Sequence, residues 1–186
     1  MELFEKKLES ELIFDGKVVH LYKDKIELPN GNCAFREYVK RIGAVCVVPI
    51  TDENEVLLVR QYRYAVDEVL TEIPAGKLDF AGEDPLSAAV RELSEETGAM
   101  AKNIVPLGIY YGSPAIMGEK IYMYLATGLS FKKQHLDDDE FLDVTKLKLE
   151  DAVKQVLDGT LRDGKTQSAI LRAAAMISPE IFSKIN

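Results

Sequence analysis

Residues 72–99, EIPAGKLDFAGEDPLSAAVRELSEETGA, constrain the fold more than any other part of the chain. The second half of this segment predicts a helix with a defined beginning and end. Asp84 is a favoured N-cap, and Pro85 suits the first helical position, where its missing N–H costs nothing. Gly98 can adopt the left-handed conformation that ends a helix. The chain must therefore pack one well-bounded helix against the rest of the protein.

The predicted helix carries three glutamates, Glu92, Glu95 and Glu96, at spacings of i, i+3 and i+4. Side chains with these spacings lie on one face, with Cβ atoms roughly 5–6 Å apart. Such carboxylates repel one another unless a cation lies among them, and Mg²⁺ is a hard cation that takes oxygen ligands. An isolated pattern of this kind is more often a solvated acidic face. We expect an apolar stripe of the same helix to face the core: Leu86, Ala89, Val90, Leu93 and Thr97.

A loop rich in small residues precedes the helix and favours the metal site over the solvated face. Residues 74–76 read Pro-Ala-Gly, and Gly82 leads into the helix cap. Glycines at positions 76 and 82 suit a tight loop that folds back beside the helix. A backbone carbonyl of this loop could then join the acids as a metal ligand.

Composition excludes several classes of function. The net charge is −8, from 23 Lys and Arg against 31 Asp and Glu, which argues against broad binding to nucleic acid or to an anionic membrane. The two cysteines, Cys33 and Cys46, form no CxxC, so neither a disulfide framework nor a zinc site is expected. The first residues are charged, and no apolar run approaches the roughly 20 residues that a membrane span requires. We therefore expect a cytoplasmic protein.

The chain is expected to contain two parts. Residues 1–42 read as strands separated by turns at 15–16 and 29–32, which predicts a small antiparallel sheet. Residues 43–186 begin with AVCVVPI, a nearly continuous apolar run typical of a strand that is covered on both faces. Further strands are expected at 55–64, 105–111, 120–129 and 141–144, and helices at 149–157 and 166–177. The predicted fold class is α+β, a mixed sheet with helices packed against it.

The segment that begins at Gly76 resembles the box of the Nudix hydrolases, GX5EX7REUXEEXGU, where U is a bulky apolar residue. Glu83 is followed by seven residues and then by RELSEETGA at 91–99. There are two departures: six residues separate Gly76 from Glu83 instead of five, and the final U is only Ala99. The resemblance implies an α/β/α sandwich around a mixed sheet. It also implies metal-dependent hydrolysis of a nucleoside diphosphate linked to another moiety.

Transferred position by position, the resemblance implies that one to three Mg²⁺ or Mn²⁺ ions bind oxygen atoms around the box helix. Glu92 and Glu96 match the main ligands, and Glu95 matches a ligand of a second or third ion with a part in catalysis. The Ala75 carbonyl is a further ligand. Arg91 resembles the arginine that orients a glutamate, with Glu83 as its usual partner.

Features outside the box resemble the ADP-ribose pyrophosphatase branch, in which the products are AMP and ribose 5-phosphate. These features are Arg-Glu at 36–37, RQYR at 60–63, EIPAG at 72–76 and Ser-Pro at 113–114. The branch usually reads Ser-Pro-Gly, where this chain has Ser113-Pro114-Ala115. The resemblance implies a domain-swapped homodimer that binds the nucleotide sugar partly through the N-terminal sheet. The implied substrate-binding residues are Arg36, Glu37, Arg63, Ser113 and Glu119.

The acidic stretch DDDE at 137–140 is the best source of a general base, since the box acids serve as ligands. Asp138 falls where the branch has its base glutamate, and Glu140 matches a metal ligand. Asp138 is one methylene shorter than the usual residue, so the sequence leaves open whether Asp138 or Glu140 is the base. For an arbitrary DDDE, a solvated turn is the more common outcome.

Two other functions stay open at this level. One keeps the chemistry and changes the substrate to another nucleoside diphosphate sugar, such as GDP-mannose. The other is a regulator that binds ADP-ribose without turnover. Non-catalytic domains of this kind usually lose box glutamates, whereas all four are present here: Glu83, Glu92, Glu95 and Glu96.

Overall fold

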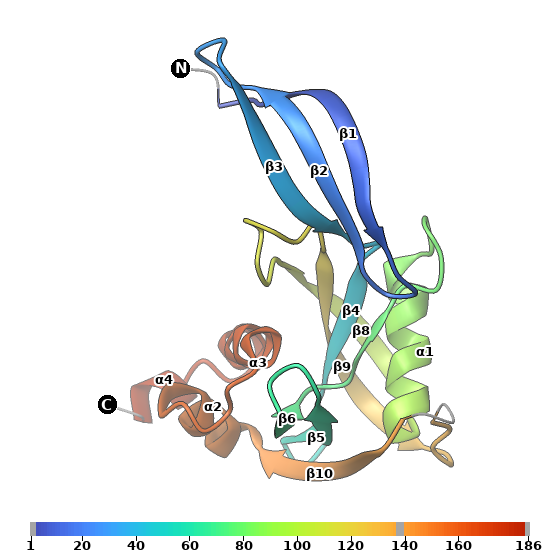
Figure 1. Ribbon diagram of the computed structural model, residues 1–186. Helices are drawn as coiled ribbons and strands as arrows, with labels where there is room; N and C mark the ends of the chain where they lie inside the picture. The colour runs from blue at the N-terminus through green and yellow to red at the C-terminus, as the bar shows by residue number, and fades with distance from the viewer. Residues whose placement is uncertain (1–2, 137–139, 185–186) are drawn as a thin grey trace. The chain divides into compact units, whose positions relative to one another are not determined.

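A computed structural model describes residues 3–136 and 140–184, and the chain divides into two compact units (Figure 1). The first unit contains Met1–Ile42 and Tyr111–Lys120, and the second contains Gly43–Tyr110 and Ile121–Asn186. Among the helices of the described residues, none is long and apolar enough to cross a membrane.

The first unit is built on a three-stranded antiparallel sheet in the order β1 (Lys6–Asp15), β2 (His20–Glu27) and β3 (Cys33–Lys40). β1 pairs with the whole length of β2. Asp24 of β2 is buried, and its carboxylate accepts a hydrogen bond from the Tyr38 hydroxyl at 3.2 Å. Every residue of β1 is exposed.

A segment that is distant in the sequence, Tyr111–Lys120, completes the first unit. The Val39 N–H donates to the Ile116 carbonyl at 2.8 Å, and the Gly118 N–H donates to the Val39 carbonyl at 3.0 Å. Arg41 Nε lies 3.2 Å from Glu119 Oε1. The sequence predicted strands on both sides of this segment but not its association with the first 42 residues.

Within its described residues, the second unit contains two sheets and four helices. The larger sheet is mixed, because β4 and β9 are parallel while the outer pairs are antiparallel; its order is β7 (Ala75–Lys77), β4 (Ala44–Pro49), β9 (Ile121–Phe131) and β8 (Ala99–Tyr110). The smaller antiparallel sheet has the order β10 (Leu142–Lys148), β5 (Glu55–Arg63) and β6 (Glu68–Glu72). The helices are α1 (Pro85–Thr97), α2 (Leu149–Leu157), α3 (Gly164–Ile177) and α4 (Ile181–Lys184). The sequence did not predict β6, β7 and α4, which are too short for a periodic pattern.

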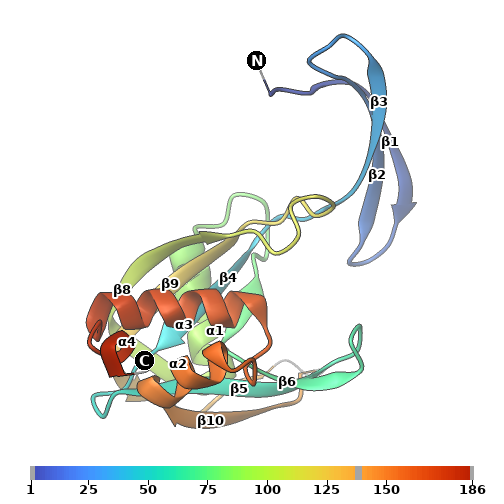
Figure 2. The ribbon, with the colours of Figure 1, turned by 90° about the vertical axis from the view of Figure 1, so that its left-hand side faces the viewer.

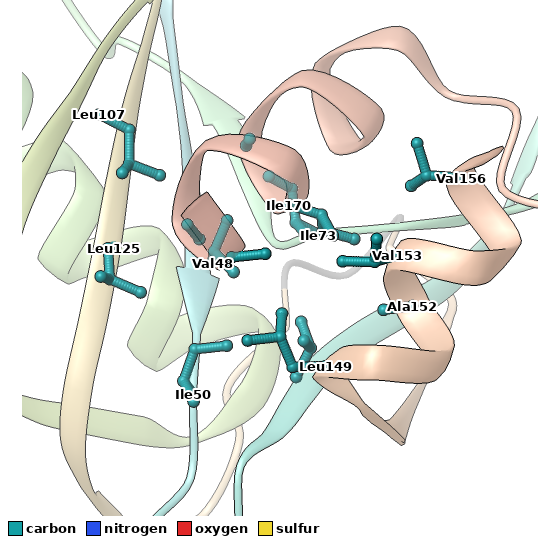
Figure 3. Close-up of a cluster of buried hydrophobic side chains, with 14 of the residues drawn as sticks. Val48, Ile50, Ile73, Leu107, Leu125, Leu149, Ala152, Val153, Val156 and Ile170 are labelled. Atoms are coloured by element: carbon teal, nitrogen blue, oxygen red, sulfur yellow. The ribbon is translucent and has the colours of Figure 1, made fainter. Parts of the chain in front are cut away.

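Strand β4 separates two hydrophobic cores. Val45 and Val47 pack with Leu93 of α1. Cys46 and Val48 belong to the other core, with Ile170 of α3 (Figure 3). Figure 1 shows α1 on one side of the larger sheet and α2 and α3 on the other, and Figure 2 shows α2, α3 and α4 grouped together. The predicted α/β/α sandwich around a mixed sheet is confirmed, as is the strand covered on both faces.

The caps of α1 follow the sequence. Asp84 accepts a hydrogen bond from the Ser87 N–H at 2.9 Å, and Gly98 has a φ of 67°. The predicted apolar stripe is wrong in part, because Leu86 and Val90 are exposed. Glu92 and Glu96 are buried in their place. The helix turns these two carboxylates toward β7, and this rotation moves Leu86 and Val90 into solvent.

Gly98 also allows the backbone of Lys132 to approach the end of α1 closely, which is separate from its role as a helix cap. A Cβ at this position would overlap the carbonyl oxygen of Lys132. The Lys132 N–H in turn donates to the Gly98 carbonyl at 2.7 Å. The chain that leaves β9 is therefore held directly against the end of α1.

We predict that Gly98→Ala destabilises the protein more than Gly159→Ala. Gly159 also has a positive φ, of 81°, but a Cβ added there would meet no atom within 4 Å, so its substitution costs only the left-handed backbone, about 1–2 kcal/mol. The overlap with Lys132 should add at least about 1 kcal/mol for Gly98→Ala. Urea unfolding of both variants measures the difference. Equal losses would show that the chain after β9 is not held at this point.

Candidate active site

The site is centred on two buried carboxylates of α1 that face the backbone of β7. Glu92 is 8% exposed and Glu96 is 3% exposed. The Ala75 N–H donates to Glu96 Oε2 at 3.0 Å. A Cβ on Gly76 would overlap the carboxylate of Glu92, so only glycine allows this approach. The predicted loop of small residues thus folds back beside the helix, with Ala75 and Gly76 in a short strand.

Arg91 supplies a positive charge in direct contact with Glu92. Its Nη1 donates to Glu92 Oε1 at 2.8 Å and to Glu95 Oε2 at 3.1 Å. Its Nη2 lies 3.6 Å from Glu83 Oε1, so the expected pair exists but is longer than the other two. Asp79 Oδ2 lies 3.3 Å from Nε of the same side chain. One guanidinium is thus shared among four carboxylates.

Burial and mutual repulsion raise the pKa values of the two central acids. Burial, together with the charges of Glu95 and Glu140, raises the pKa of Glu92 to about 7, although Arg91 acts in the opposite direction. Burial also raises the pKa of Glu96 to about 8; the charges of Glu92 and Glu140 add to this, and the Ala75 N–H and Arg63 oppose it. Burial therefore favours the protonated, uncharged form of both carboxyls.

Glu140, the last residue of the acidic stretch 137–140, acts electrostatically on the same site. The charge of Glu140 acts on both Glu92 and Glu96, which places Glu140 near the box acids. The chain leading to it is bound to the end of α1, where the His135 N–H donates to the Glu95 carbonyl at 3.1 Å. Asp138, the other predicted base, lies outside the described residues.

Arg63, at the end of β5, belongs to a second group of charges. Its Nε and Nη2 donate to Glu72 Oε1 and Oε2 at 2.7 and 2.6 Å. Lys165 Nζ donates to the same Glu72 carboxylate and to Asp163 Oδ2 at 3.0 Å. Burial disfavours the charged form of Glu72, but Arg63 and Lys165 hold the pKa of Glu72 below its ordinary value.

The sequence pointed to Arg63 but missed three members of this group: Glu72, Asp163 and Lys165. Glu72 belongs to the EIPAG motif, whose only signal in the sequence is the family resemblance, and the two others lie in DGK at 163–165. No local pattern distinguishes a lysine that pairs with a residue 93 positions away from a surface lysine.

The other predicted substrate-binding residues lie in the first unit. Arg36 pairs with Glu5, and Glu37 is exposed, opposite Lys23 in the sheet register. Glu119 pairs with Arg41 at 3.2 Å. The Ser113 carbonyl accepts hydrogen bonds from the N–H groups of residues 116 and 117 at 3.1 and 2.8 Å. Arg63 and the box residues belong to the second unit.

The donor atoms of the box suit a hard cation. Glu92, Glu95, Glu96 and Glu140 offer carboxylate oxygens, and the absence of a Cβ at Gly76 lets the Glu92 carboxylate lie against the β7 backbone. Within residues 3–136 and 140–184, no group of three or more Asp, Glu, His or Cys side chains is arranged to hold a metal ion. In this structure Glu92 and Glu95 are both hydrogen-bonded to Arg91.

Comparison with known proteins agrees with this geometry. Residues 40–167 match the family model of the NUDIX domain. The chain is 45% identical over 170 residues to an ADP-ribose pyrophosphatase of Bacillus subtilis (strain 168), covering 90% of this chain and 91% of the relative. It is 44% identical over 172 residues to a methanol dehydrogenase activator of Bacillus methanolicus, covering 91% and 92%. A crystal structure of an ADP compounds hydrolase superposes with a TM-score of 0.81 at 22% identity, covering 95% of each chain, which shows the shared fold.

The family match spans well over half of the chain and includes β7, α1 and Arg63, the elements from which the site is built. Together with the identity to the Bacillus subtilis relative, it shows that this chain belongs to the NUDIX family of hydrolases.

Proposed function

We propose that this chain is an Mg²⁺-dependent ADP-ribose diphosphatase, which cleaves the pyrophosphate bond to give AMP and ribose 5-phosphate. The observation that carries the proposal is the pair of buried carboxylates, Glu92 and Glu96, packed against β7. The named activity of the Bacillus subtilis relative supports the choice of substrate.

NUDIX hydrolases need a divalent metal ion, and we propose Mg²⁺, with Mn²⁺ as a substitute and one to three ions per site. The residues that would hold the ions are the Ala75 carbonyl, Glu92, Glu95, Glu96 and Glu140. When bound, such ions neutralise phosphate oxygens and lower the pKa of coordinated water. In the structure, the Arg91 guanidinium neutralises part of the negative charge of these acids through its bonds to Glu92 and Glu95.

A general base must take a proton from the attacking water, and we propose that it comes from residues 137–140. The influence of Glu140 on Glu92 and Glu96 supports this placement. Asp138 remains the other candidate. A comparison of kcat for Asp138→Asn and Glu140→Gln, measured separately, distinguishes the two.

We propose that Arg63 binds the diphosphate of the substrate. A guanidinium has five N–H donors, and the bonds to Glu72 use two of them, on one edge. The opposite edge can still make a bidentate contact with a phosphate. The side chain is 40% exposed, so an anion can reach it. Arg36, Glu37, Ser113 and Glu119 are proposed as further contacts, on the family resemblance alone.

We also propose that the first unit pairs with a second copy of the chain, in a domain-swapped homodimer. A three-stranded sheet is near the minimum for independent stability and normally needs one covered face. Every residue of β1 is exposed, including Leu8, Leu12 and Phe14. Large apolar side chains gathered on one exposed strand are typical of an interaction surface.

Two alternatives remain. The substrate could be another nucleoside diphosphate sugar, such as GDP-mannose. The second alternative is a regulator of a partner protein that binds ADP-ribose without turnover. The similarity to a relative named methanol dehydrogenase activator supports this alternative. The intact box glutamates favour catalysis. The free state of Cys33 and Cys46 fits the proposed cytoplasmic setting.

We predict that the purified protein with Mg²⁺ hydrolyses ADP-ribose faster than GDP-mannose, and that Glu96→Gln lowers kcat by orders of magnitude. Glutamine can still accept the Ala75 N–H, so folding should be nearly unchanged. Release of AMP is measured by chromatography, in ¹⁸O-labelled water to find the attacked phosphorus. Glu53→Gln, on an exposed turn, is the matched control. Binding of ADP-ribose without AMP release would favour the regulator.

We predict that affinity for Mg²⁺ rises with pH. The pKa values of Glu92 and Glu96, about 7 and about 8, lie above the ordinary value, so both carboxyls are largely protonated at pH 6.5. Ions bind the deprotonated forms, so affinity should increase between pH 6.5 and 8.5, by about tenfold or more, with release of protons. Calorimetry in two buffers of different ionisation enthalpy measures both effects. Binding that does not depend on pH would contradict the role of these two acids as ligands.

We predict that the protein sediments at twice the mass of one chain, and that Leu12→Glu shifts it toward the monomer. A charge placed on the exposed face of β1 would be buried without a partner in the dimer. Leu157→Glu, which also adds a charge at an exposed leucine but on α2, should leave the dimer intact. Analytical ultracentrifugation measures the masses. A monomeric wild type would contradict the dimer.

A further inference from the structure

A compact group of four charges lies beside the box and has no part in the metal site. It joins the end of β5, the end of β6 and the first turn of α3 through Arg63, Glu72, Lys165 and its neighbour Asp163. Two positive and two negative charges balance within the group. Such balance is needed because unpaired buried charges are strongly destabilising.

Glu72 is the centre of this group. Its side chain is 1% exposed, and both of its oxygens accept hydrogen bonds from Arg63. Oε2 also accepts a bond from Lys165. The Lys165 side chain is itself only 12% exposed, and its position is fixed by a second bond, to Asp163 at 3.0 Å. Lys165 and Arg63 therefore both bond to the Glu72 carboxylate and share its Oε2.

This arrangement orients the Arg63 guanidinium. A bidentate bond to a fixed carboxylate determines both the position and the plane of the group. The charge of Arg63 also acts on Glu96, so this guanidinium lies near the box acids. An exposed arginine without this anchor would sample many rotamers and would lose that freedom when it bound an anion.

The same turn of α3 holds the backbone next to Glu72. The hydroxyl of Thr166 is buried and accepts the Ile73 N–H at 3.0 Å. Pro74 and then Ala75, which faces Glu96, follow directly in the chain. The first turn of α3 thus fixes the chain on both sides of the peptide that joins Glu72 to Ile73.

We propose that Lys165 is a positioning residue for the hydrolysis of the substrate diphosphate. It acts through Glu72, which it holds in place so that Arg63 presents its outer edge to the phosphates. This inference deepens the proposed function and rests on it. Lys165 does not touch the substrate.

The test is a double-mutant cycle of Lys165→Met and Arg63→Ala, with ADP-ribose and saturating Mg²⁺. Misplacement of a phosphate-binding group costs up to about a hundredfold, so Lys165→Met should lower kcat/KM by about tenfold to a hundredfold, mainly through KM. In the Arg63→Ala background the same change should cost less than about threefold, because no guanidinium remains to be positioned. Lys154→Met, on the exposed face of α2, removes the same charge as a matched control and should leave activity unchanged.

A second measurement does not depend on turnover. The Arg63 Nε–H signal in a ¹H–¹⁵N NMR spectrum, assigned by its loss in Arg63→Ala, should exchange with water at least about tenfold faster in Lys165→Met than in the wild type. Lys165→Gln, which keeps a donor for Glu72 without the charge, should give an intermediate rate. It also replaces Lys165→Met if that variant does not fold.

The outcomes separate the inference from the proposed function. Equal losses from Lys165→Met in both backgrounds, or an unchanged exchange rate at Arg63, overturn the positioning role even if ADP-ribose is the substrate. Failure of the wild type to hydrolyse ADP-ribose overturns the proposed function. In that event the exchange rate still decides whether Lys165 holds Arg63.

Discussion

The contact between two buried carboxylates and the backbone of β7 is the constraint on which the geometry of the site depends. Burial of a carboxylate is unfavourable unless the charge is neutralised or hydrogen-bonded. Glu96 receives the Ala75 N–H, while Glu92 lies where any side chain at position 76 would be. In this contact Glu92 and Glu96 of α1 face β7 while Leu86 is exposed, and burial raises the pKa of both acids, although the Ala75 N–H acts in the opposite direction on Glu96.

Both helical layers of the sandwich contribute to this contact. From one side, α1 supplies the acids, and its C-terminal end binds the chain that leads to Glu140. From the other side, the first turn of α3 binds Glu72 and Ile73, directly before β7. The segment that faces Glu92 and Glu96 is thus held between two elements that belong to different hydrophobic cores. This explains how a strand of only three residues can be placed accurately.

The features that the sequence predicted well are those determined locally. The caps of α1 depend on Asp84 and Gly98 alone, and the doubly covered strand β4 appears as an apolar run. The orientation of α1 was predicted less well, since periodicity treats every glutamate as exposed and every valine as buried. Val90 is exposed and Glu92 is buried, which is the reverse of that expectation. The pairing of Glu72 with Lys165 and the association of 111–120 with the first unit depend on tertiary contacts that no local pattern contains.

The two arginines of the site have different partners, and we infer that their roles differ for this reason. Arg91 bonds directly to Glu92 and Glu95, so its charge competes with any cation that these acids bind. Arg63 is bonded to Glu72 instead, although its charge also acts on Glu96. Without Glu72, attraction would draw Arg63 toward the box acids, where it would oppose the cation as Arg91 does. The buried Glu72 therefore keeps one positive charge close to the acids but turned outward, where an anionic substrate can meet it.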